Sequence, residues 1–315
     1  MNIVFLDSTV IPKHIPIPRP SFAHTWTEYE HTSAEQTIER AKGADIVITS
    51  KVIFDRETLQ QLPKLKLIAI TATGTNNVDL VAAQELGVAV RNVSGYSSTT
   101  VPEHVLGLIF SLKHSLAGWL RDQTSAKWSE SKQFCYFDYP ITDVRGSTLG
   151  VFGKGCLGTE VGRLAEAVGM KVLYAEHKDA VVCREGYTPF HDVLKQADII
   201  TLHCPLTETT KHLINADTLS QMKKGAFLIN TGRGPLVDEL ALFDALKSGH
   251  LAGAALDVLV KEPPEKDNPL ILAAKTMPNL IITPHIAWAS DSAVTTLVGK
   301  VTQNIEEFVQ QLNEK

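Results

Sequence analysis

Cysteines are scarce in this sequence, and those present are not arranged for disulfide or metal chemistry. Four thiols occur in 315 residues, at Cys135, Cys156, Cys183 and Cys204. They form no CxxC pair and no Cys/His cluster with zinc spacing, which excludes a disulfide scaffold and a zinc module. We therefore expect reduced thiols, no bound metal and a cytoplasmic location.

Long apolar runs and excess basic charge are missing as well. The stretch Val105–Leu112 is interrupted by Gly107 and Ser111 and falls short of the roughly 18 residues of a membrane span. The first residues carry no basic segment and reach Asp7 too early for a secretory signal. Lys and Arg number 30 against 35 Asp and Glu, a net charge of −5, without any Lys/Arg-rich run. Neither a membrane nor a nucleic acid is expected as the principal partner.

The sequence does contain a regular alternation of short apolar runs and amphipathic stretches, which is typical of parallel α/β sheets. A length of 315 residues with 44% hydrophobic and 21% charged residues suits two globular domains. A first series of strands is expected at Asn2–Leu6, Asp45–Thr49, Leu67–Ile70 and Val88–Val90, with helices at Ala34–Lys42, Arg56–Leu62 and Leu80–Leu86. A second series of strands is expected at Thr148–Phe152, Lys171–Ala175, Ile199–Leu202, Ala226–Ile229, Ala252–Leu256 and Leu280–Ile282.

Two longer stretches, Val101–Leu120 and Asp291–Leu312, have apolar residues at helical spacing. Both are expected to cross between domains, which makes the first domain discontinuous. We predict that it comprises residues 1–98 and 287–315, with residues 99–286 as the second domain. Hinges are expected near Ser94–Val101 and Ala287–Ser290.

A glycine-rich turn follows the apolar strand that ends at Phe152. Gly153, Gly155 and Gly158 form the GxGxxG pattern, and the chain then continues as a helix. The first glycine allows a tight turn, the second allows backbone N–H groups to approach a pyrophosphate, and the third allows close packing of helix and strand. Cys156 is interpreted as a spacer whose main-chain N–H serves the phosphate, a reactive thiolate at the helix start being the alternative.

The next strand ends in Glu176, near the offset of roughly 20 residues expected for a ribose-binding carboxylate. Such a carboxylate accepts both ribose hydroxyls and repels a 2′-phosphate, so NAD is favoured over NADP. The neighbouring His177 and Lys178 weaken that exclusion, and NADP stays open. His203 ends a later strand and is followed by Cys204 and Pro205. His203 and Pro205 are predicted to contact the cofactor, with a structural role as the alternative for His203.

Three further polar residues each follow a different strand of the second series. Arg233 follows the strand ending near Asn230, Glu262 follows the strand ending at Leu256, and His285 follows the strand ending at Ile282. Singly, each has an ordinary interpretation as a surface or loop residue. Together, at the sheet edge where open α/β sheets bind ligands, they suit reduction of a 2-keto acid. The guanidinium would bind carboxylate and keto oxygens, the imidazolium would donate a proton, and the carboxylate would hold the imidazole protonated.

Along essentially its whole length, the sequence resembles the D-isomer-specific 2-hydroxyacid dehydrogenase family. The stretches that carry the resemblance are Thr73–Asp79, Gly153–Gly158, His203–Thr207, Asn230–Gly234, Asp257–Val258 and Pro284–His285. The resemblance implies an α/β protein with two doubly wound parallel-sheet domains. A Rossmann NAD-binding domain would be inserted into a discontinuous, flavodoxin-like substrate domain, with the active site in the cleft between them.

The resemblance also implies residue roles. Arg233 would bind substrate, Glu262 would partner the histidine, and His285 would be the acid/base. Gly74 and Thr75 would offer N–H groups to the substrate carboxylate. Contacts to the cofactor are implied for Cys156, Leu157, Glu176, Thr231, Gly232 and Asp257. The family is commonly dimeric through the nucleotide domain, so a homodimer is expected.

Within the family, Asn92–Tyr96 and Val101–His104 look most like the glycerate dehydrogenase (hydroxypyruvate reductase) branch. Pro102 and Glu176 depart from the usual residues, and Trp288 resembles a tryptophan of the family's co-repressor members. We therefore expect an NAD-dependent enzyme that interconverts a small 2-keto acid and its D-2-hydroxy acid, hydroxypyruvate and D-glycerate first, glyoxylate or pyruvate otherwise. The alternatives are a dinucleotide-sensing binding protein and a phosphoglycerate-type dehydrogenase, for which the sequence offers no regulatory domain.

Overall fold

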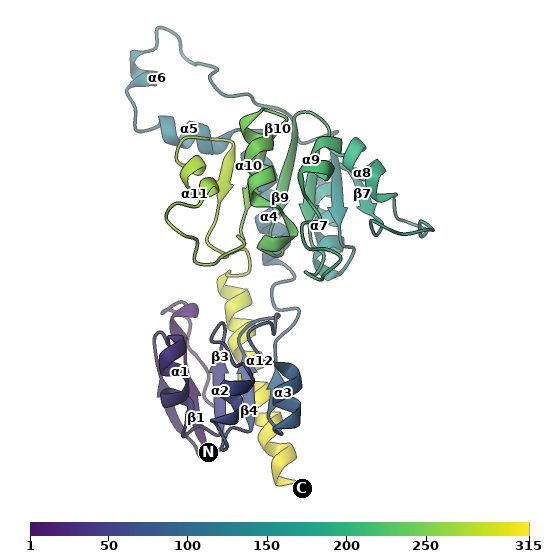
Figure 1. The fold of residues 1–315 in the computed structure, drawn as a ribbon. Coiled ribbons are helices and arrows are strands. Elements are labelled where there is room, and N and C mark those ends of the chain that lie inside the picture. Colours follow the sequence, from purple (N-terminus) through teal and green to yellow (C-terminus); the bar gives the residue numbers. More distant parts are fainter. Residues whose placement is uncertain (315) are drawn as a thin grey trace. The chain divides into compact units, whose positions relative to one another are not determined.

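The computed structural model describes residues 1–314, and the chain divides into two compact units (Figure 1). Unit 1 comprises Met1–Ser97 together with the C-terminal segment from Ala289, and unit 2 comprises Ser98–Trp288. The domain limits expected from the sequence lie within two residues of these boundaries, and both boundaries fall inside the segments expected as hinges. Hinge motion itself stays a prediction.

Unit 1 is built on a parallel sheet with the strand order β2-β1-β3-β4-β5, the order of a flavodoxin-like doubly wound sheet. Its central strands β3 and β4 are buried at every position, as expected for apolar runs covered by helices on both faces. The strands are β1 (Asn2–Phe5), β2 (Thr25–Glu28), β3 (Ile46–Thr49), β4 (Leu67–Ile70) and β5 (Ala89–Arg91). The helices are α1 (Ala34–Ala41), α2 (Arg56–Gln60), α3 (Leu80–Glu85) and α12 (Asp291–Asn313), with a 3-10 turn at Ser8–Val10.

Strand β2 was not predicted from the sequence. It pairs in parallel with β1, Asn2 opposite Thr25, and forms an edge of the sheet. Three of its four residues are exposed and only Trp26 is half-buried. An edge strand of this kind needs no apolar run, so it leaves no hydrophobic pattern to detect.

Helix α12 matches the expected helix to within one residue at its C-terminal end. It packs on β4 and buries an apolar stripe that includes Leu297, Val301 and Ile305. The expectation that the two long helices cross between domains is wrong, because α12 belongs to unit 1 and α4 (Thr100–Lys113) to unit 2. The short segments before these helices make the crossings.

Unit 2 contains a parallel sheet in the order β11-β10-β9-β8-β6-β7. Beyond β7, Thr188 makes a single parallel bridge to Ala175 and stands where a third Rossmann strand would lie. If β6 is counted as strand 1, β7 as strand 2, the Thr188 position as strand 3 and β8 to β10 as strands 4 to 6, the order is the 3-2-1-4-5-6 of a dinucleotide-binding sheet. Strand β11 is added at the edge next to β10. The strands are β6 (Thr148–Phe152), β7 (Lys171–Ala175), β8 (Ile199–Leu202), β9 (Ala226–Asn230), β10 (Leu251–Leu256) and β11 (Leu280–Ile282). Besides α4, the helices are α5 (Leu116–Asp122), α6 (Lys127–Glu130), α7 (Cys156–Ala167), α8 (Phe190–Gln196), α9 (Ala216–Gln221), α10 (Glu239–Lys247) and α11 (Pro269–Ala274).

The helix expected over Val101–Leu120 is interrupted. Ser115 adopts φ 52°, a left-handed conformation that ends α4 and redirects the chain into α5. The chain then runs through α6 in an arm, defined here as residues 116–142, which projects from the rest of unit 2 (Figure 1). The backbone N–H of Thr142 donates to the carbonyl oxygen of Lys113 (2.8 Å), so both ends of the arm meet at one point.

Candidate active site

The glycine turn after β6 is shaped by close backbone contacts. Gly153 has φ +107°, and a Cβ at this position would lie 2.6 Å from the backbone of His203 and Cys204. A Cβ on Gly158 would lie 1.9 Å from the carbonyl oxygen of Gly153, so helix α7 packs against the turn itself. A Cβ on Gly155, in contrast, would meet nothing within 4 Å. The middle of the turn is therefore open at the start of α7, where the first N–H groups of the helix have no intrahelical acceptor.

Two neighbouring strand ends complete this region of unit 2. The hydroxyl oxygen Oγ1 of Thr231, just after β9, is buried and has no hydrogen-bond partner among the described residues. His203, just after β8, has its Nε2 2.9 Å from Oγ1 of Thr201, and desolvation lowers the pKa of its ring to about 4. A neutral histidine, an unpaired hydroxyl and an open N-terminal helix turn fit a dinucleotide. The roles of Leu157, Pro205 and Gly232 toward the cofactor stay predictions.

Glu176 lies at the end of β7, level with the glycine turn, because Ala175 pairs with Phe152. Its carboxylate accepts from the backbone N–H groups of His177 (2.8 Å) and Arg184 (3.0 Å). The Arg184 side chain adds two more bonds, from Nε (2.7 Å) and Nη2 (2.6 Å). These bonds to Arg184 lower the pKa of Glu176 to about 2. Arg184 was missed from the sequence, because it follows eight residues later in a loop without a motif.

Arg233 is held in a turn immediately after β9. Asn230, which is fully buried, donates from Nδ2 to the carbonyl oxygen of Arg233 (2.8 Å) and accepts from the N–H of Gly232 (3.0 Å). The guanidinium donates from Nη1 to the carbonyl oxygen of Gly232 (2.8 Å). A Cβ on Gly234 would lie 2.0 Å from the carbonyl carbon and oxygen of Leu259, so only glycine lets the turn approach the loop after β10. The turn is thereby fixed against the loop that carries Glu262.

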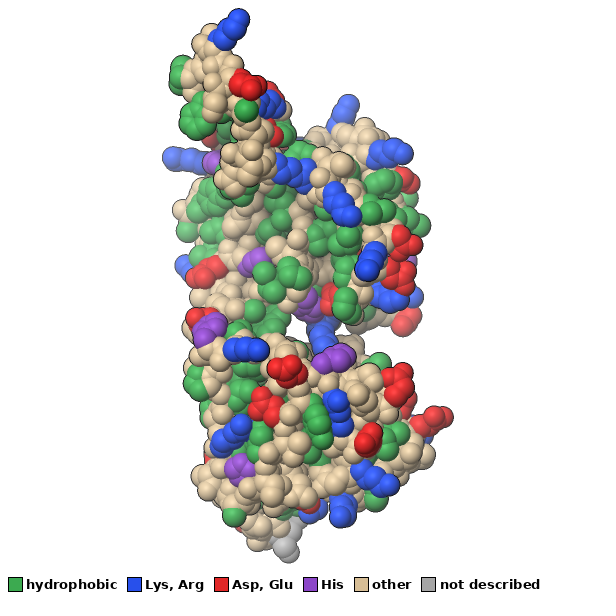
Figure 2. All heavy atoms as spheres, turned by 90° about the vertical axis from the view of Figure 1, so that its left-hand side faces the viewer, with side chains coloured by type: hydrophobic (Ala, Val, Ile, Leu, Met, Phe, Trp, Pro, Cys, Tyr) green, Lys and Arg blue, Asp and Glu red, His purple; other side chains and the backbone are tan. Residues whose placement is uncertain are grey.

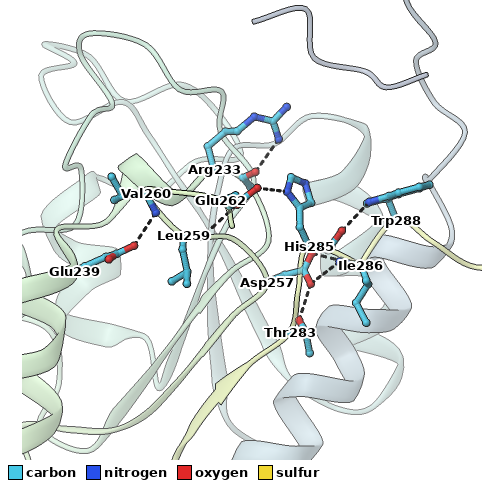
Figure 3. Close-up of polar contacts among 12 residues, drawn as sticks. Arg233, Glu239, Asp257, Leu259, Val260, Glu262, Thr283, His285, Ile286 and Trp288 are labelled. Carbon is cyan, nitrogen blue, oxygen red and sulfur yellow. Dashed lines mark hydrogen bonds and ion pairs between the residues drawn. The ribbon is translucent and has the colours of Figure 1, made fainter. Parts of the chain in front are cut away.

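Glu262 and His285 form the central pair of the site. Oε2 of Glu262 lies 2.6 Å from Nδ1 of His285, and its Oε1 accepts from the N–H of Leu259 (3.0 Å). About a quarter to a third of each side chain is exposed, 26% for His285 and 31% for Glu262. With Nδ1 directed at the carboxylate, Nε2 is the ring nitrogen left to exchange a proton with a ligand. Figure 3 shows Arg233, Glu262 and His285 gathered in one region of unit 2.

The backbone of His285 is strained and is fixed by its neighbours. The residue has φ +55°, in the left-handed region that side chains other than glycine adopt at a cost. Its N–H donates to the carbonyl oxygens of Asp257 (2.8 Å) and Thr283 (3.0 Å). Its carbonyl oxygen accepts from Nε1 of Trp288 (2.8 Å). The strained conformation is therefore bonded on both sides (Figure 3).

Asp257 organises the same loop from within the core. It is 2% exposed, and its carboxylate accepts from Oγ1 of Thr283 (2.5 Å) and from the N–H groups of Ile286 and Ala287 (both 2.9 Å). The sequence placed Asp257 among the cofactor contacts, and that role stays a prediction. The structure adds that its carboxylate holds the His285 loop. The hydroxyl of Thr283 was not predicted as the partner of Asp257.

Gly74 and Thr75, the predicted substrate contacts, belong to unit 1. They are half-buried in the loop that follows β4. Hydrogen bonds fix this loop on both sides, from Oγ1 of Thr73 to the carbonyl oxygen of Val93 (3.0 Å) and from the N–H of Val78 to that of Thr75 (3.0 Å). All other predicted site residues lie in unit 2, either in the first turn of α7 or in the segments that follow its strands.

Comparison with protein families gives a match over residues 106–287 to the D-isomer specific 2-hydroxyacid dehydrogenase, NAD binding domain. This match covers more than half of the chain. The chain belongs to the D-isomer specific 2-hydroxyacid dehydrogenase family. Its second domain is the NAD-binding domain of that family, and the predicted family, fold class and cofactor are confirmed.

Individual relatives agree with this assignment of the dehydrogenase. A protein of Haemophilus influenzae, described in general terms as a 2-hydroxyacid dehydrogenase, is 91% identical over the full length of both chains. A glycerate dehydrogenase of Methylorubrum extorquens is 46% identical over 98% of this chain and 96% of its own. Among solved structures, a D-lactate dehydrogenase from Aquifex aeolicus, complexed with NAD and lactic acid, is 28% identical with a TM-score of 0.81. It covers 99% of this chain and 97% of its own.

In residues 1–314, no helix of the dehydrogenase combines the length and apolarity needed to cross a membrane.

The four cysteines are free thiols, and burial raises the pKa of Cys204, beside the glycine turn, to about 11.

Proposed function

We propose that this dehydrogenase reduces a small 2-oxo acid to its D-2-hydroxy acid, with hydroxypyruvate and D-glycerate as the substrate pair. The observation that carries the proposal is the 2.6 Å contact between Glu262 and His285. A carboxylate at Nδ1 fixes the orientation of the ring and leaves Nε2 as the nitrogen that exchanges a proton with the substrate. The choice of hydroxypyruvate is supported by the glycerate dehydrogenase that is 46% identical over nearly the whole chain.

Each of the three residues has a separate task in this reaction. The Arg233 guanidinium binds the substrate carboxylate and the keto oxygen, since its planar fork matches two oxygens. His285 gives the proton from Nε2 to the keto oxygen, which becomes the hydroxyl of the product. Glu262 holds the orientation of the His285 ring through its contact with Nδ1. On unit 1, the N–H groups of Gly74 and Thr75 are assigned to the substrate carboxylate.

The cofactor has a defined place in this scheme. When bound, the reduced nicotinamide supplies the hydride that C2 of the 2-oxo acid accepts. The residues that would hold the dinucleotide are the glycine turn, the start of α7 and the strand ends at Thr231 and His203. The open Gly155 position and the Thr231 hydroxyl, which has no hydrogen-bond partner within residues 1–314, support that assignment.

The direct test is turnover of a substrate panel. Purified protein with NADH is offered hydroxypyruvate, glyoxylate, pyruvate and a bulky aromatic 2-oxo acid, and the loss of NADH is followed. We expect the highest kcat/KM with hydroxypyruvate and a product of D configuration by chiral chromatography. The His285→Gln variant is the control for contaminating activity. NADH binding without turnover of any 2-oxo acid would instead assign the chain to dinucleotide-sensing binding proteins.

We further propose that the dehydrogenase is a homodimer joined through the arm. Three aromatic side chains of the arm are exposed: Trp128 by 66%, Phe134 by 88% and Phe137 by 83%. Figure 2 shows hydrophobic side chains on this projecting part at the top of the view. Exposed aromatic side chains in one segment are costly in water and typical of an interface core. A second copy presents the same segment, so a two-fold contact would cover both.

Light scattering after gel filtration tests the dimer. The double variant Phe134→Ser with Phe137→Ser is expected to shift the protein to the mass of one chain. Leu240→Ser is the matched control, because Leu240 is an exposed apolar residue (65%) on α10, outside the arm. A wild-type protein with the mass of a single chain would overturn the proposal.

A further inference from the structure

The end of β7 is the position at which a Rossmann domain meets the adenosine ribose of its nucleotide. Glu176 occupies that position here, one residue beyond the Phe152–Ala175 pair and beside the glycine turn. The loop after it is closed, because the N–H of Glu176 donates to the carbonyl oxygen of Thr188 (2.9 Å). Residues 177–187 thus leave β7 and return to its end. The side chains of this loop, Arg184 among them, therefore lie next to the expected ribose site.

The Glu176 carboxylate has no acceptor position left for a ribose. A carboxylate offers about four lone-pair sites, and four N–H donors fill them, three of which come from Arg184. The side chain of Glu176 is only 3% exposed, whereas that of Arg184 is 52% exposed. The group facing solvent at this site is therefore the guanidinium and not the carboxylate. The negative charge that would repel a phosphate is paired.

Arg184 has a second edge that remains available for a ligand. Its Nε and Nη2 point at Glu176, and the opposite edge, formed by Nη1 and Nη2, is a further pair of donors with the spacing of two phosphate oxygens. The guanidinium is held in place by stacking on Tyr187, with its Cζ 4.0 Å from the ring centroid. A preorganised arginine loses little entropy when it binds an anion.

A second cation, Lys154, contacts the same tyrosine ring. Nζ of Lys154, the residue after Gly153, is 5.1 Å from the ring centroid of Tyr187 and 4.5 Å from that of Tyr174. It also donates to the carbonyl oxygen of Gly186 (3.3 Å), so it is tied to the loop that carries Arg184. Glu176, Arg184 and Lys154 together carry a charge of +1.

We propose that the dehydrogenase binds NADPH as well as NADH, with Arg184 as the residue that receives the 2′-phosphate and Lys154 as the supporting cation. Glu176 acts as a positioning residue that orients the guanidinium. This inference rests on the nucleotide half of the proposed function only. It does not depend on which 2-oxo acid is reduced.

Nucleotide binding without turnover is the test, so that a failure of the substrate assignment leaves the result interpretable. Calorimetric titration compares adenosine 2′,5′-bisphosphate with 5′-AMP, and NADPH with NADH. For the wild type we expect the 2′-phosphate to tighten binding of the adenosine probe. For Arg184→Ala we expect NADPH affinity to fall about 10- to 100-fold, as for a lost charge-assisted pair. NADH affinity should change much less, because a ribose hydroxyl makes a weaker bond.

Two further variants keep the test decisive. Glu176→Gln with Arg184→Gln leaves no unpaired buried carboxylate, so it addresses the case in which Arg184→Ala does not fold. It should also lose the preference for the 2′-phosphate. Arg163→Ala is the matched control, since Arg163 forms the same two-bond contact with Glu160 (2.9 and 2.6 Å) on α7. A wild type that binds 5′-AMP more tightly than the bisphosphate, or an equal loss of NADH and NADPH in the variants, would overturn the proposal.

Discussion

Trp288 donates from Nε1 to the carbonyl oxygen of His285, 2.8 Å away, and so fixes the far side of a residue whose φ is +55°. The near side is fixed by Asp257, whose carbonyl oxygen accepts from the His285 N–H. The position of the imidazole is thus fixed by bonds to its own backbone as well as by Glu262. This arrangement makes Trp288 a positioning residue for His285, the proposed proton donor.

Trp288→Phe should lower kcat several-fold while leaving the KM for the 2-oxo acid nearly unchanged. Phenylalanine keeps an aromatic ring but cannot donate, so the left-handed backbone loses one support, at a cost of about 1 kcal/mol in the free energy of unfolding. Steady-state kinetics and urea denaturation measure the two effects. Trp119→Phe is a matched control, because Trp119 donates to the carbonyl oxygen of His114 (3.2 Å) away from the site. An unchanged kcat would show that His285 does not need this bond.

His285→Ala should lower kcat by roughly 10²–10⁴, the usual contribution of a general acid. NADH affinity should stay close to that of the wild type, since the ring is assigned to the substrate. Adding Glu262→Gln to this variant should cost little more, because the two residues act as a unit. Rate measurements on both single variants and the double variant give the coupling. Additive losses would mean that Glu262 acts independently of the histidine.

Arg233→Lys should raise KM and lower kcat together. A lysine keeps the charge but cannot present two donors in one plane, so both binding and orientation of the 2-oxo acid suffer. Initial-rate kinetics over a range of substrate concentrations separate the two parameters. A rise in KM alone would assign Arg233 to ground-state binding without a role in orientation.

The stability of the protein should fall between pH 6.5 and about 4 through His203. Burial lowers the pKa of His203 from 6.5 to about 4, so in this window the unfolded chain takes up a proton that the folded chain does not. The free energy of unfolding therefore decreases as pH falls, by at most about 1.4 kcal/mol per pH unit from this one group. Urea denaturation of His203→Gln should give a flatter pH dependence than the wild type. The exposed His191→Gln variant serves as the control.

The elements that the sequence predicted well are those whose pattern depends on burial alone. Strands such as β4 and β8 are covered on both faces and read as continuous apolar runs. Edge strand β2 carries no such run, and the break at Ser115 is a local backbone conformation that helical periodicity does not report. The predicted helix was therefore too long, and the strand was missed.

In the candidate site, residues at strand ends could be predicted from the sequence, whereas contacts made by loops could not. Arg233, Glu262 and His285 could be found because each follows a strand end, and parallel strands bring those ends to one edge. The role of Arg184 depends on a loop that returns to its own strand, which spacing does not reveal. Asp257 was predicted as a site residue from its position after β10, but its bonds to the His285 loop depend on the folded path of residues 283–287 and leave no sequence pattern.

The hydrogen bond between Thr142 and Lys113 brings the two ends of the arm, residues 116–142, together at the surface of the nucleotide-binding domain. A second hydrogen bond, from Oγ of Ser115 to the carbonyl oxygen of Pro140 (2.6 Å), also joins the two ends of the arm. Because the chain leaves and re-enters at neighbouring points, we expect that the arm can be deleted and its ends joined by a short glycine linker while the sheet of unit 2 still forms. If the arm carries the dimer contact proposed above, deletion of residues 116–142 should give a monomeric form of the enzyme.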